Sequence, residues 1–505
     1  MRKALSALLL MAAPAFALTA CNSQSAGVTT MPGVQPNARA GAYGKHRAHD
    51  FSSADLHAGG ATFPAYAYNL GNQPTGAFNG PQEPPGTGSL FALAPTTGTI
   101  YYCLTGSGFG RAVYTSDGAE KGVANATTQA CAPIGASPTG FGGRQDPPDF
   151  AGSDQALLAA DYTSYYLPDR EGGTAGSGQG EPFEFPSVGG AITYAYRPKE
   201  LGKAFPNGMK LSTWTFCAIA NGTVASWNDP AIAADNGVKA DKLPNQPITF
   251  YFRSDGSGTS FYTTNYLSTA CTSSWKAPYD GAPYQGSGRS AAWTFGANQT
   301  WPGPGSATDP NSRFIGESGN PGVLAAIQST PYSTGYVEGA WAASANPTVD
   351  VPSVQSGVYA SGADKGKPIF VNALSDPKSI HKSIDKLVAR DITYGGSGDV
   401  PSETIPTTRP DCIIFVNPDH FQKQPAGAYP IVAISYLLFY QKNNAHYADD
   451  KTIVNYVTGA KTTASETAYQ ATLKLGYFPL SKSLHTAIQN ALNGTGHSSK
   501  PCLNP

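Results

Sequence analysis

The sequence predicts an α/β protein with long loops, and three observations lead to this prediction. Short runs of β-branched and aromatic residues alternate with segments of helical pattern, which is typical of α/β folds. Stretches rich in Gly, Pro and Asn separate these elements, and no repeat of solenoid length is present. The 505 residues are enough for more than one domain and a sizeable core.

The individual elements follow from local patterns. Strands are predicted at residues 99–104, 191–196, 247–252, 334–339 and 367–372. Helices are predicted at residues 64–70, 258–268, 322–329, 429–441 and 451–458. The Gly- and Pro-rich stretches are interpreted as surface insertions, at residues 71–98, 115–148, 169–182 and 276–312.

Residues 1–21 have the pattern of an export signal. A cationic start precedes an apolar run that is too short for a good membrane span. The run ends at Leu18-Thr19-Ala20-Cys21, which resembles the bacterial lipoprotein box and makes Cys21 the expected lipid anchor. Cleavage nearby, with Cys21 left as a free thiol, is the alternative. An exported, lipid-anchored protein of the periplasm or cell surface is expected.

Residues 22–50 have almost no apolar periodicity and are interpreted as a flexible tether. His46 and His49 lie in this tether, and His57 follows it. Scattered imidazoles in a solvated linker are favoured over a metal site. Charged residues make up 13% of the chain and the formal net charge is −1, so the sequence offers no basic field for nucleic acid.

Six cysteines remain after Cys21, and an even number in an exported chain indicates disulfides. Fifteen connectivities are compatible with six cysteines. Pairing of nearest neighbours in the sequence is the hypothesis, with bonds Cys103–Cys131, Cys217–Cys271 and Cys412–Cys502. No CxxC motif and no Cys/His spacing typical of zinc sites occurs, so no metal is expected.

One stretch concentrates polar groups where a predicted strand meets a predicted helix. Residues 252–261 read FRSDGSGTSF. The N–H groups at the start of a helix form an anion site, by geometry and by the helix dipole. Arg253 adds a planar guanidinium, and Ser257 and Thr259 add hydroxyl donors. In the alternative interpretation Asp255 or Ser257 only caps the helix.

Three further turns have a similar character. Gly59–Pro64 contains Thr62 as the expected N-cap of a helix. Thr105–Gly110 follows a predicted strand and contains Ser107, but it has neither the order of a dinucleotide fingerprint nor the Lys of a P-loop. Asp149–Asp154 places a carboxylate after a run of small and apolar residues.

The ordered set GGATFPA, the Gly-Ser-Gly turn, DFAGSD and RSDGSGTSF resembles the phosphate-binding subunits of bacterial ABC phosphate importers, the PstS-type proteins. FPSVGGAITYAY and SGNPGVLAAIQSTPYSTGYVEGAW are similar to the two inter-domain crossovers of that family. The resemblance implies an α/β, two-domain, hinged periplasmic-binding-protein fold of type II, with the ligand cleft between the domains. It implies one domain from residues 51–186 plus 342–505 and a second from residues 187–341.

The resemblance also implies a ligand and partners. Inorganic phosphate would bind without a cofactor, and a monomer would pass it to the membrane subunits of an ABC importer. The membrane would be contacted only through the lipid anchor. The family's phosphate contacts match Thr62, Phe63, Ser107, Asp154, Arg253, Asp255, Ser257, Gly258 and Thr259. The sequence departs from the family at Phe109, where a small residue is usual, and in the insertion between Ser107 and Asp154.

An anion site that contains two carboxylates needs a physical reason. Hydrogen phosphate still carries a proton, and an ionised aspartate only accepts hydrogen bonds. Asp154 is therefore expected to accept the ligand's proton and to repel sulfate, which has no proton to donate. Asp255 is expected to hold Arg253 in place. Arsenate shares the shape and protonation of phosphate, so strong exclusion of arsenate is not expected.

Three other functions stay open. An enzyme is one, but Ser107 and Ser257 do not lie in a G-x-S-x-G elbow and the histidines show no metal-ligand spacing, so no catalytic residue is expected. An adhesive or scaffolding surface protein that kept the fold is the second. A binder of another oxyanion, such as arsenate or a phosphate ester, is the third.

Overall fold

The computed structural model describes residues 54–72, 84–115, 148–165, 180–271, 289–385, 392–394, 407–418, 424–442, 446–458, 466–495 and 500–504. These residues belong to one compact unit, Arg47–Pro505. The predicted signal peptide, Cys21, the predicted tether and Cys131 lie outside the described residues. None of the helices in the described ranges is both long and apolar enough to cross a lipid bilayer.

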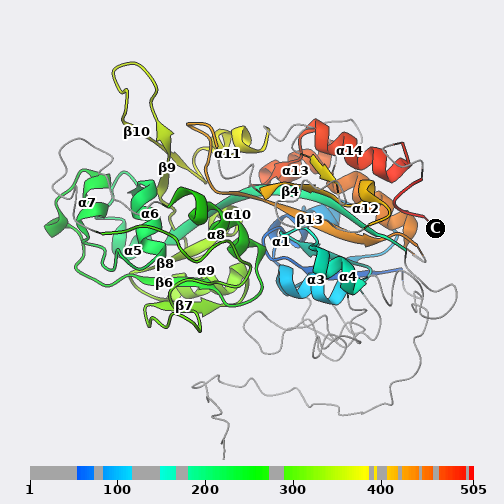
Figure 1. The fold of residues 1–505 in the computed structure, drawn as a ribbon, viewed down its shortest axis with the longest axis horizontal. Coiled ribbons are helices and arrows are strands. Elements are labelled where there is room, and N and C mark those ends of the chain that lie inside the picture. Colours follow the sequence, from blue (N-terminus) through cyan, green and yellow to red (C-terminus); the bar gives the residue numbers. More distant parts are fainter. Residues whose placement is uncertain are drawn as a thin grey trace, which may run out of the picture. The chain divides into compact units, whose positions relative to one another are not determined.

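The described strands and helices alternate along the chain, as Figure 1 shows. The strands are β1 (Leu56–Gly60), β2 (Ile100–Leu104), β3 (Phe150–Ser153), β4 (Pro182–Tyr196), β5 (Lys210–Leu211), β6 (Thr249–Arg253), β7 (Phe314–Glu317), β8 (Ser333–Glu338), β9 (Ser353–Val358), β10 (Pro368–Asn372), β11 (Ile392–Tyr394), β12 (Ile414–Val416), β13 (Val432–Tyr440) and β14 (Phe478–Pro479). The α-helices are α1 (Ala65–Asn69), α2 (Leu90–Leu93), α3 (Ser107–Thr115), α4 (Ala159–Tyr165), α5 (Pro198–Leu201), α6 (Thr213–Ala220), α7 (Pro230–Asn236), α8 (Gly258–Ala270), α9 (Gly319–Ser329), α10 (Gly339–Ala343), α11 (Pro377–Ile384), α12 (Tyr447–Val457), α13 (Glu466–Lys474) and α14 (Lys482–Asn493). Two 3₁₀-helices are η2 (Ala240–Lys242) and η4 (Pro410–Cys412).

A mixed sheet is the main structural layer of the described chain. Its strands follow the order β2-β1-β3-β13-β4-β8-β6-β7, and β14 pairs with β4. At one end β2, β1 and β3 are parallel, and β13 runs antiparallel to β3. At the other end β7, β6 and β8 are parallel, and β4 runs antiparallel to β8. The sheet therefore consists of two similar halves that meet at β13 and β4.

The long strand β4 links these two halves. All 15 of its residues are buried. Residues 182–191 pair with β13 and residues 192–196 pair with β8, so the pairing partner changes within one continuous strand. The sequence-based boundary at 186/187 falls inside β4. The division into two hinged domains with the stated boundaries stays a prediction.

A second sheet has three strands, in the order β10-β9-β5. β9 pairs with β10 in an antiparallel arrangement and with β5 in a parallel one. Asp350, just before β9, also forms a bridge with Tyr196 at the end of β4. Asp350 and the first residues of β9 are therefore paired with strands that precede the sequence-based boundary at 341/342.

Residues 429–441 form a strand and not the predicted helix. All nine residues of β13 are buried, and the strand lies between β3 and β4. Figure 1 shows helices α3 and α4 on one face of this part of the sheet and α11 and α13 on the other. A strand covered on both faces is continuously apolar, and such a run has no period that separates it from a buried helix. The remaining predicted strands and helices are confirmed, with ends displaced by a few residues.

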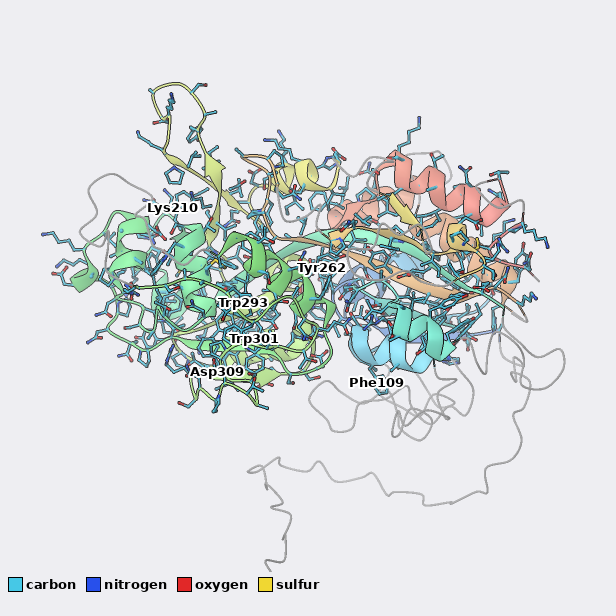
Figure 2. All side chains as sticks on the ribbon, in the orientation of Figure 1. Phe109, Lys210, Tyr262, Trp293, Trp301 and Asp309 are labelled. Carbon is cyan, nitrogen blue, oxygen red and sulfur yellow. A yellow bond between two sulfur atoms is a disulfide. The ribbon has the colours of Figure 1, made fainter. Side chains whose placement is uncertain are left out.

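Two stretches that the sequence assigned to surface insertions contribute to the core where the structure describes them. In residues 84–98, Phe91 of α2 is buried and its ring lies 4.6 Å from that of Tyr68. In residues 289–312, Trp293 and Trp301 are buried, and Figure 2 labels both beside β6 and β8. The Trp301 ring stacks 5.5 Å from that of Phe252. The expectation of surface insertions is wrong for these parts, because large aromatic side chains bury much apolar area even in Gly- and Pro-rich segments.

Two of the predicted disulfides are present. Cys217–Cys271 joins α6 to the end of α8, with Cα atoms 5.6 Å apart. Cys412–Cys502 joins η4 to the C-terminal segment, with Cα atoms 5.4 Å apart. Cys103 in β2 is also disulfide-bonded, and its predicted partner lies outside the described residues.

Candidate functional site

The carboxyl ends of both half-sheets point toward the middle of β4. Glu338, the last residue of β8, is opposite Ile192 of β4. Ser153, the last residue of β3, is opposite Tyr436 of β13, and Tyr436 is in turn opposite Pro186 of β4. The turns after the parallel strands therefore converge near the middle of β4. In open α/β sheets, ligands bind outside the carboxyl ends of the strands.

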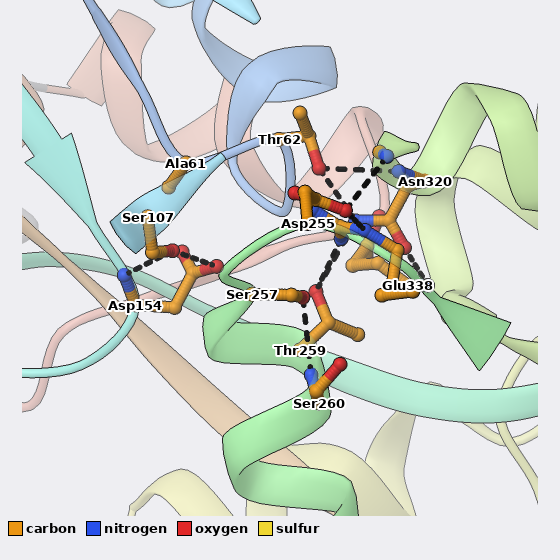
Figure 3. A network of polar contacts seen from close by, with 12 residues as sticks. Ala61, Thr62, Ser107, Asp154, Asp255, Ser257, Thr259, Ser260, Asn320 and Glu338 are labelled. Atoms are coloured by element: carbon orange, nitrogen blue, oxygen red, sulfur yellow. Dashed lines mark hydrogen bonds and ion pairs between the residues drawn. The ribbon is translucent and has the colours of Figure 1, made fainter. Parts of the chain in front are cut away.

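Four of these turns carry the residues that the sequence singled out. β1 leads to Thr62 and Phe63, β2 leads to Ser107, β3 leads to Asp154, and β6 leads to the stretch 253–259. The side chains of Thr62, Phe63, Ser107, Asp154, Arg253, Ser257 and Thr259 are all fully or almost fully buried. Figure 3 shows Thr62, Ser107, Asp154, Ser257 and Thr259 close to one another among the polar contacts of the site. The structure brings together residues that are up to 197 positions apart, from Thr62 to Thr259.

The start of α8 supplies backbone donors. Ser257 is the N-cap, and its hydroxyl accepts from the Ser260 N–H at 3.1 Å. Ser257 therefore caps α8, and this is the part of the alternative interpretation that the structure confirms. Gly258 and Thr259 occupy the first helical positions, where no helical carbonyl can accept their N–H groups. No acceptor for these two N–H groups occurs among the described residues.

Arg253 is the cation of the site and is almost fully buried. Its Nε donates to Asp255 Oδ1 at 2.6 Å, and its Nη2 forms an ion pair with Asp255 Oδ2. Burial opposes the charge on the guanidinium, but the adjacent Asp255 outweighs this effect and the pKa of Arg253 is raised. Asp255 Oδ1 also accepts from the Gly319 N–H at the start of α9. Asp255 therefore fixes the orientation of Arg253, as expected from the sequence.

Asp154 is the acceptor of the site. Its Oδ2 accepts from the Ser107 hydroxyl at 3.0 Å, and its own N–H donates back to Ser107 Oγ at 3.1 Å. Its Oδ1 is buried and has no hydrogen-bond partner among the described residues. Burial raises the pKa of Asp154 to about 7, although the hydroxyls of Ser435 and Ser107 and the charge of Arg253 lower it. The Asp154 carboxyl therefore changes charge near neutral pH.

The turns of the two half-sheets are in van der Waals contact. A Cβ atom added at Gly258 would lie 2.3 Å from the Cβ of Asp154, so only glycine fits there. Gly106 has a φ of +94°, and a Cβ there would lie 2.3 Å from Asp255 Oδ2. The Gly108 N–H donates to the Gly256 carbonyl at 2.8 Å. These glycines therefore make room for protein groups of the opposite turn.

Thr62 has a different role from the predicted one. The N-cap of α1 is Pro64, so the prediction of Thr62 as a helix cap is wrong. Thr62 Oγ1 instead accepts from the backbone N–H of Asn320, at 3.1 Å. The Thr62 carbonyl accepts from Trp341 Nε1 at 2.8 Å, and the Phe63 carbonyl accepts from the Tyr477 hydroxyl. This turn is anchored by its carbonyls, which leaves its N–H groups for other partners.

The sequence did not identify three residues of the cluster. Asn320 is buried at the start of α9 and contacts both Thr62 and Thr259. Glu338 accepts from two N–H groups at the start of α10, and burial raises its pKa to about 8. Gln299, within the supposed surface insertion, accepts from the Ser257 N–H through its carbonyl. The GNP turn at Asn320 was quoted only as part of a crossover, and no short motif marks Gln299.

The arrangement of several donors around one acceptor suits a small anion. One guanidinium, helix N-terminal N–H groups and threonine hydroxyls face the same cluster as one carboxylate with an unpartnered oxygen. The only group of possible metal ligands in the described ranges is Asp411, Cys412 and Cys502. Two members of that group form a disulfide with each other, which removes their thiolates as ligands.

Comparison with known protein families decides the classification. A model of the PBP superfamily domain matches residues 107–391, which is more than half of the chain. The chain belongs to the PBP superfamily.

Curated relatives within this superfamily include PstS proteins. The chain is 27% identical over 320 residues to "Phosphate-binding protein PstS" of Methanocaldococcus jannaschii. This match covers 62% of the present chain and 67% of the relative. The chain is 28% identical over 345 residues to "Phosphate-binding protein PstS 2" of Mycobacterium tuberculosis, which covers 68% of this chain and 73% of that protein. The resemblance to PstS-type proteins that the sequence motifs indicated is confirmed.

Solved structures show the same fold. A structure described as a DING protein matches with a TM-score of 0.57 at 19% identity, covering 87% of this chain and 94% of that one. A phosphate-binding protein of Stenotrophomonas maltophilia matches with a TM-score of 0.53 at 18% identity, covering 88% and 96%. The predicted periplasmic-binding-protein fold is therefore confirmed.

Proposed function

We propose that this protein binds inorganic phosphate, as hydrogen phosphate, in the cluster formed by Thr62, Phe63, Ser107, Asp154, Arg253, Asp255, Ser257, Gly258 and Thr259. One observation carries the proposal: Asp154 Oδ1 is buried without a partner in the described chain, beside a helix N-terminus with free N–H groups. A site that combines such an acceptor with many donors suits an anion that still carries a proton. The names of the PstS relatives support the same ligand.

The charges explain why the ligand is bound largely by dipoles. Asp255 compensates Arg253, so the cluster has little net positive charge before Asp154 is counted. The N–H groups of Gly258 and Thr259 and the N–H of Ser107 are oriented by the fold before any ligand arrives. Such preoriented donors stabilise an anion in a dry site without the cost of reorienting water. The Ser107 hydroxyl is bonded to Asp154, so its N–H group is the more direct donor.

The depth of the site favours free phosphate over its esters. Thr62, Ser257 and Thr259 have no exposed surface, and Ser107, Asp154 and Arg253 are 1% exposed. An ester needs a path for its organic group out of the cluster, and the described residues leave none of these side chains open to solvent. Arsenate has the size and protonation of phosphate and is expected to compete with it.

The wider biological role is an extension of phosphate binding. The protein captures phosphate outside the inner membrane as a monomer and delivers it to the membrane subunits of an ABC importer. Cys21 anchors it through lipid, with residues 22–50 as the tether. The relatives are binding proteins by name, which supports capture and delivery over catalysis.

Isothermal titration of the full chain tests the proposal. At pH 8, phosphate is expected to bind at one site, arsenate to compete, and sulfate and glycerol phosphate to bind far more weakly than phosphate. Arg253→Ala is expected to abolish phosphate binding, because the cluster loses its cation. Arg313→Ala is the matched control, since Arg313 donates only to the carbonyls of Ile248 and Gly222 away from the cluster. Binding of sulfate as tight as that of phosphate would overturn the proposal.

A further inference from the structure

Asn320 occupies a central position in the buried cluster. It is the second residue of α9, has no exposed surface and uses every hydrogen-bonding group of its side chain. Oδ1 accepts from the Glu338 N–H at 3.0 Å. Nδ2 donates to Thr62 Oγ1 and to Thr259 Oγ1, each at 3.3 Å. Figure 3 shows Asn320 between these threonines and Glu338.

The orientation of the Asn320 amide is fixed by its surroundings. A backbone N–H can only donate, so the atom facing the Glu338 N–H must be the amide oxygen. The amide nitrogen is then the atom that faces both threonine hydroxyls. A flipped amide would place N–H against N–H at Glu338 and is excluded by this contact.

This orientation determines the direction of the two hydroxyls. A threonine oxygen has two acceptor lone pairs and one O–H donor. Thr62 Oγ1 accepts from the N–H and the Nδ2 of Asn320, which uses both of its lone pairs. Thr259 Oγ1 accepts from Asn320 Nδ2 and from Arg253 Nη1, which uses both of its lone pairs. Each hydroxyl can then take part in further bonds only as a donor.

We infer that Asn320 is a positioning residue for anion binding that makes the Thr62 and Thr259 hydroxyls obligate donors to the ligand. The inference rests on the proposed phosphate site and adds a specificity determinant to it. Two hydroxyls that can only donate favour an oxyanion and leave Asp154 as the single acceptor of the site. Asn320 does not contact the ligand in this account, because all of its side-chain groups already have protein partners.

Asn320→Asp reverses the proposed effect with almost no change in shape. The carboxylate can still accept from the Glu338 N–H, but it has no N–H to donate to the threonines. The two hydroxyls then donate to the carboxylate and are lost to the ligand. The added negative charge also weakens anion binding, so the loss of affinity alone does not test the inference.

A double-mutant cycle with Thr259→Val separates the two effects. In the wild-type background, Thr259→Val is expected to weaken phosphate binding about tenfold, since a hydrogen bond to a charged ligand is lost. In the Asn320→Asp background the Thr259 hydroxyl no longer serves the ligand, so the same substitution is expected to change affinity less than twofold. Titration calorimetry with phosphate gives the four affinities, and thermal melting verifies that each variant is folded.

Two further variants make the cycle decisive. Asn320→Leu removes the donors without adding charge, and it replaces Asn320→Asp if that variant does not fold. In this background also, Thr259→Val is expected to cost less than it does in the wild type. Asn221→Asp is the matched control, because the Asn221 amide makes three hydrogen bonds remote from the cluster. In that background the cost of Thr259→Val is expected to stay at the wild-type value.

The outcomes are distinguishable. An equal cost of Thr259→Val in the wild-type and Asn320 backgrounds would overturn the positioning role while phosphate binding by the wild type stands. A wild-type protein that does not bind phosphate would overturn the proposed function, and this inference with it.

Discussion

Arg111 Nη2 donates to Gln299 Oε1 at 2.9 Å, and this contact joins the two half-sheets beside the buried cluster. Arg111 lies on α3, which follows β2, and is held by an ion pair with Asp161 at 2.8 Å. Gln299 lies in the segment between α8 and β7, and its carbonyl accepts from the N–H of Ser257. The pair therefore connects the Ser107 turn on one side with the N-cap of α8 on the other.

Removal of the Gln299 side chain is expected to loosen this connection. Gln299→Ala should weaken phosphate binding about fivefold to tenfold, the value of one typical hydrogen bond, mainly through faster release. Stopped-flow measurement of phosphate release tests this expectation. Gln246→Ala is the control, since Gln246 is exposed and its side chain is remote from the cluster. Equal release rates in the two variants would contradict a role for Gln299 in holding the ligand.

Sulfate binding is expected to depend on the charge of Asp154. The pKa of Asp154 is about 7, so the carboxyl is neutral below this pH and can donate a hydrogen bond to sulfate. Sulfate keeps its two charges between pH 5 and pH 8. Any change in sulfate affinity over this range therefore comes from a change in the charge of the protein. The affinity for sulfate should rise about tenfold or more as the pH falls from 8 to 5.

The matched variant for this pH series is Asp154→Asn, whose side chain is neutral throughout. It should bind sulfate with little dependence on pH. Arg253 and Asp255, the charged groups that face Asp154, are present in both proteins. A sulfate affinity of the wild type that is flat with pH would contradict the assigned role of Asp154.

The same carboxyl is expected to affect stability in the absence of ligand. The folded protein holds the Asp154 proton to a higher pH than the unfolded chain does, because burial raises the pKa from 3.8 to about 7. Stability contributed by this group is therefore complete below about pH 4 and is lost as the pH rises toward 7. Asp154→Asn should gain free energy of unfolding over the wild type across this window, by at most about 4 kcal/mol.

Urea denaturation of both proteins at several pH values measures this difference. Burial raises the pKa values of Glu184 and Glu338 to about 8. Both groups titrate in the wild type and in the variant, so their contributions cancel in the difference in free energy of unfolding. Asp364→Asn serves as the control because Asp364 is largely exposed. A wild-type protein that is as stable as Asp154→Asn at pH 8 would show that the buried charge has no cost.

Gly258→Ala is expected to disrupt the contact between the half-sheets. The new Cβ would lie 2.3 Å from the Cβ of Asp154, so α8 or the Asp154 turn must shift. The expected loss is about 1–3 kcal/mol of stability and more than tenfold in phosphate affinity. Gly339→Ala is the matched control, since Gly339 also begins a helix and its nearest atom, the Ala191 carbonyl oxygen, is 3.5 Å away. Equal melting temperatures and affinities of the two variants would contradict the close contact.

The disulfide Cys217–Cys271 is expected to stabilise the fold without shaping the site. Its cysteines are 54 residues apart, and loop closure over this length gives about 4 kcal/mol. The double variant Cys217→Ser and Cys271→Ser should lose about this much stability. Cys271 follows the far end of α8 from Ser257, so phosphate affinity of the folded variant should change less than twofold. A large loss of affinity at unchanged stability would contradict this division of roles.

The turns of the site could be predicted from the sequence because each is a local pattern. Arg253, Asp255 and Ser257 stand within five residues, and a strand followed by a capped helix dictates their geometry. The hydrogen bond from Asn320 to Thr62 spans 258 residues and has no local signature. Such contacts depend on the order of the strands in the sheet, and local patterns in one sequence do not reveal that order.

The errors in the predicted elements have physical causes. The run at 432–440 is almost entirely apolar because β13 is buried on both faces, and hydrophobic periodicity cannot distinguish such a run from a buried helix. Its β-branched and aromatic residues were the available signal for a strand. Trp293 and Trp301 were likewise the available signal that residues 289–312 pack into the core.

A crystal structure of the full chain grown with phosphate tests the central claim most directly. One phosphate is expected within hydrogen-bonding distance of the Thr62 and Thr259 hydroxyls, the N–H groups at the start of α8, the Arg253 guanidinium and Asp154 Oδ1. A phosphate bound elsewhere, or a cluster that stays without ligand at saturating phosphate, would contradict this claim.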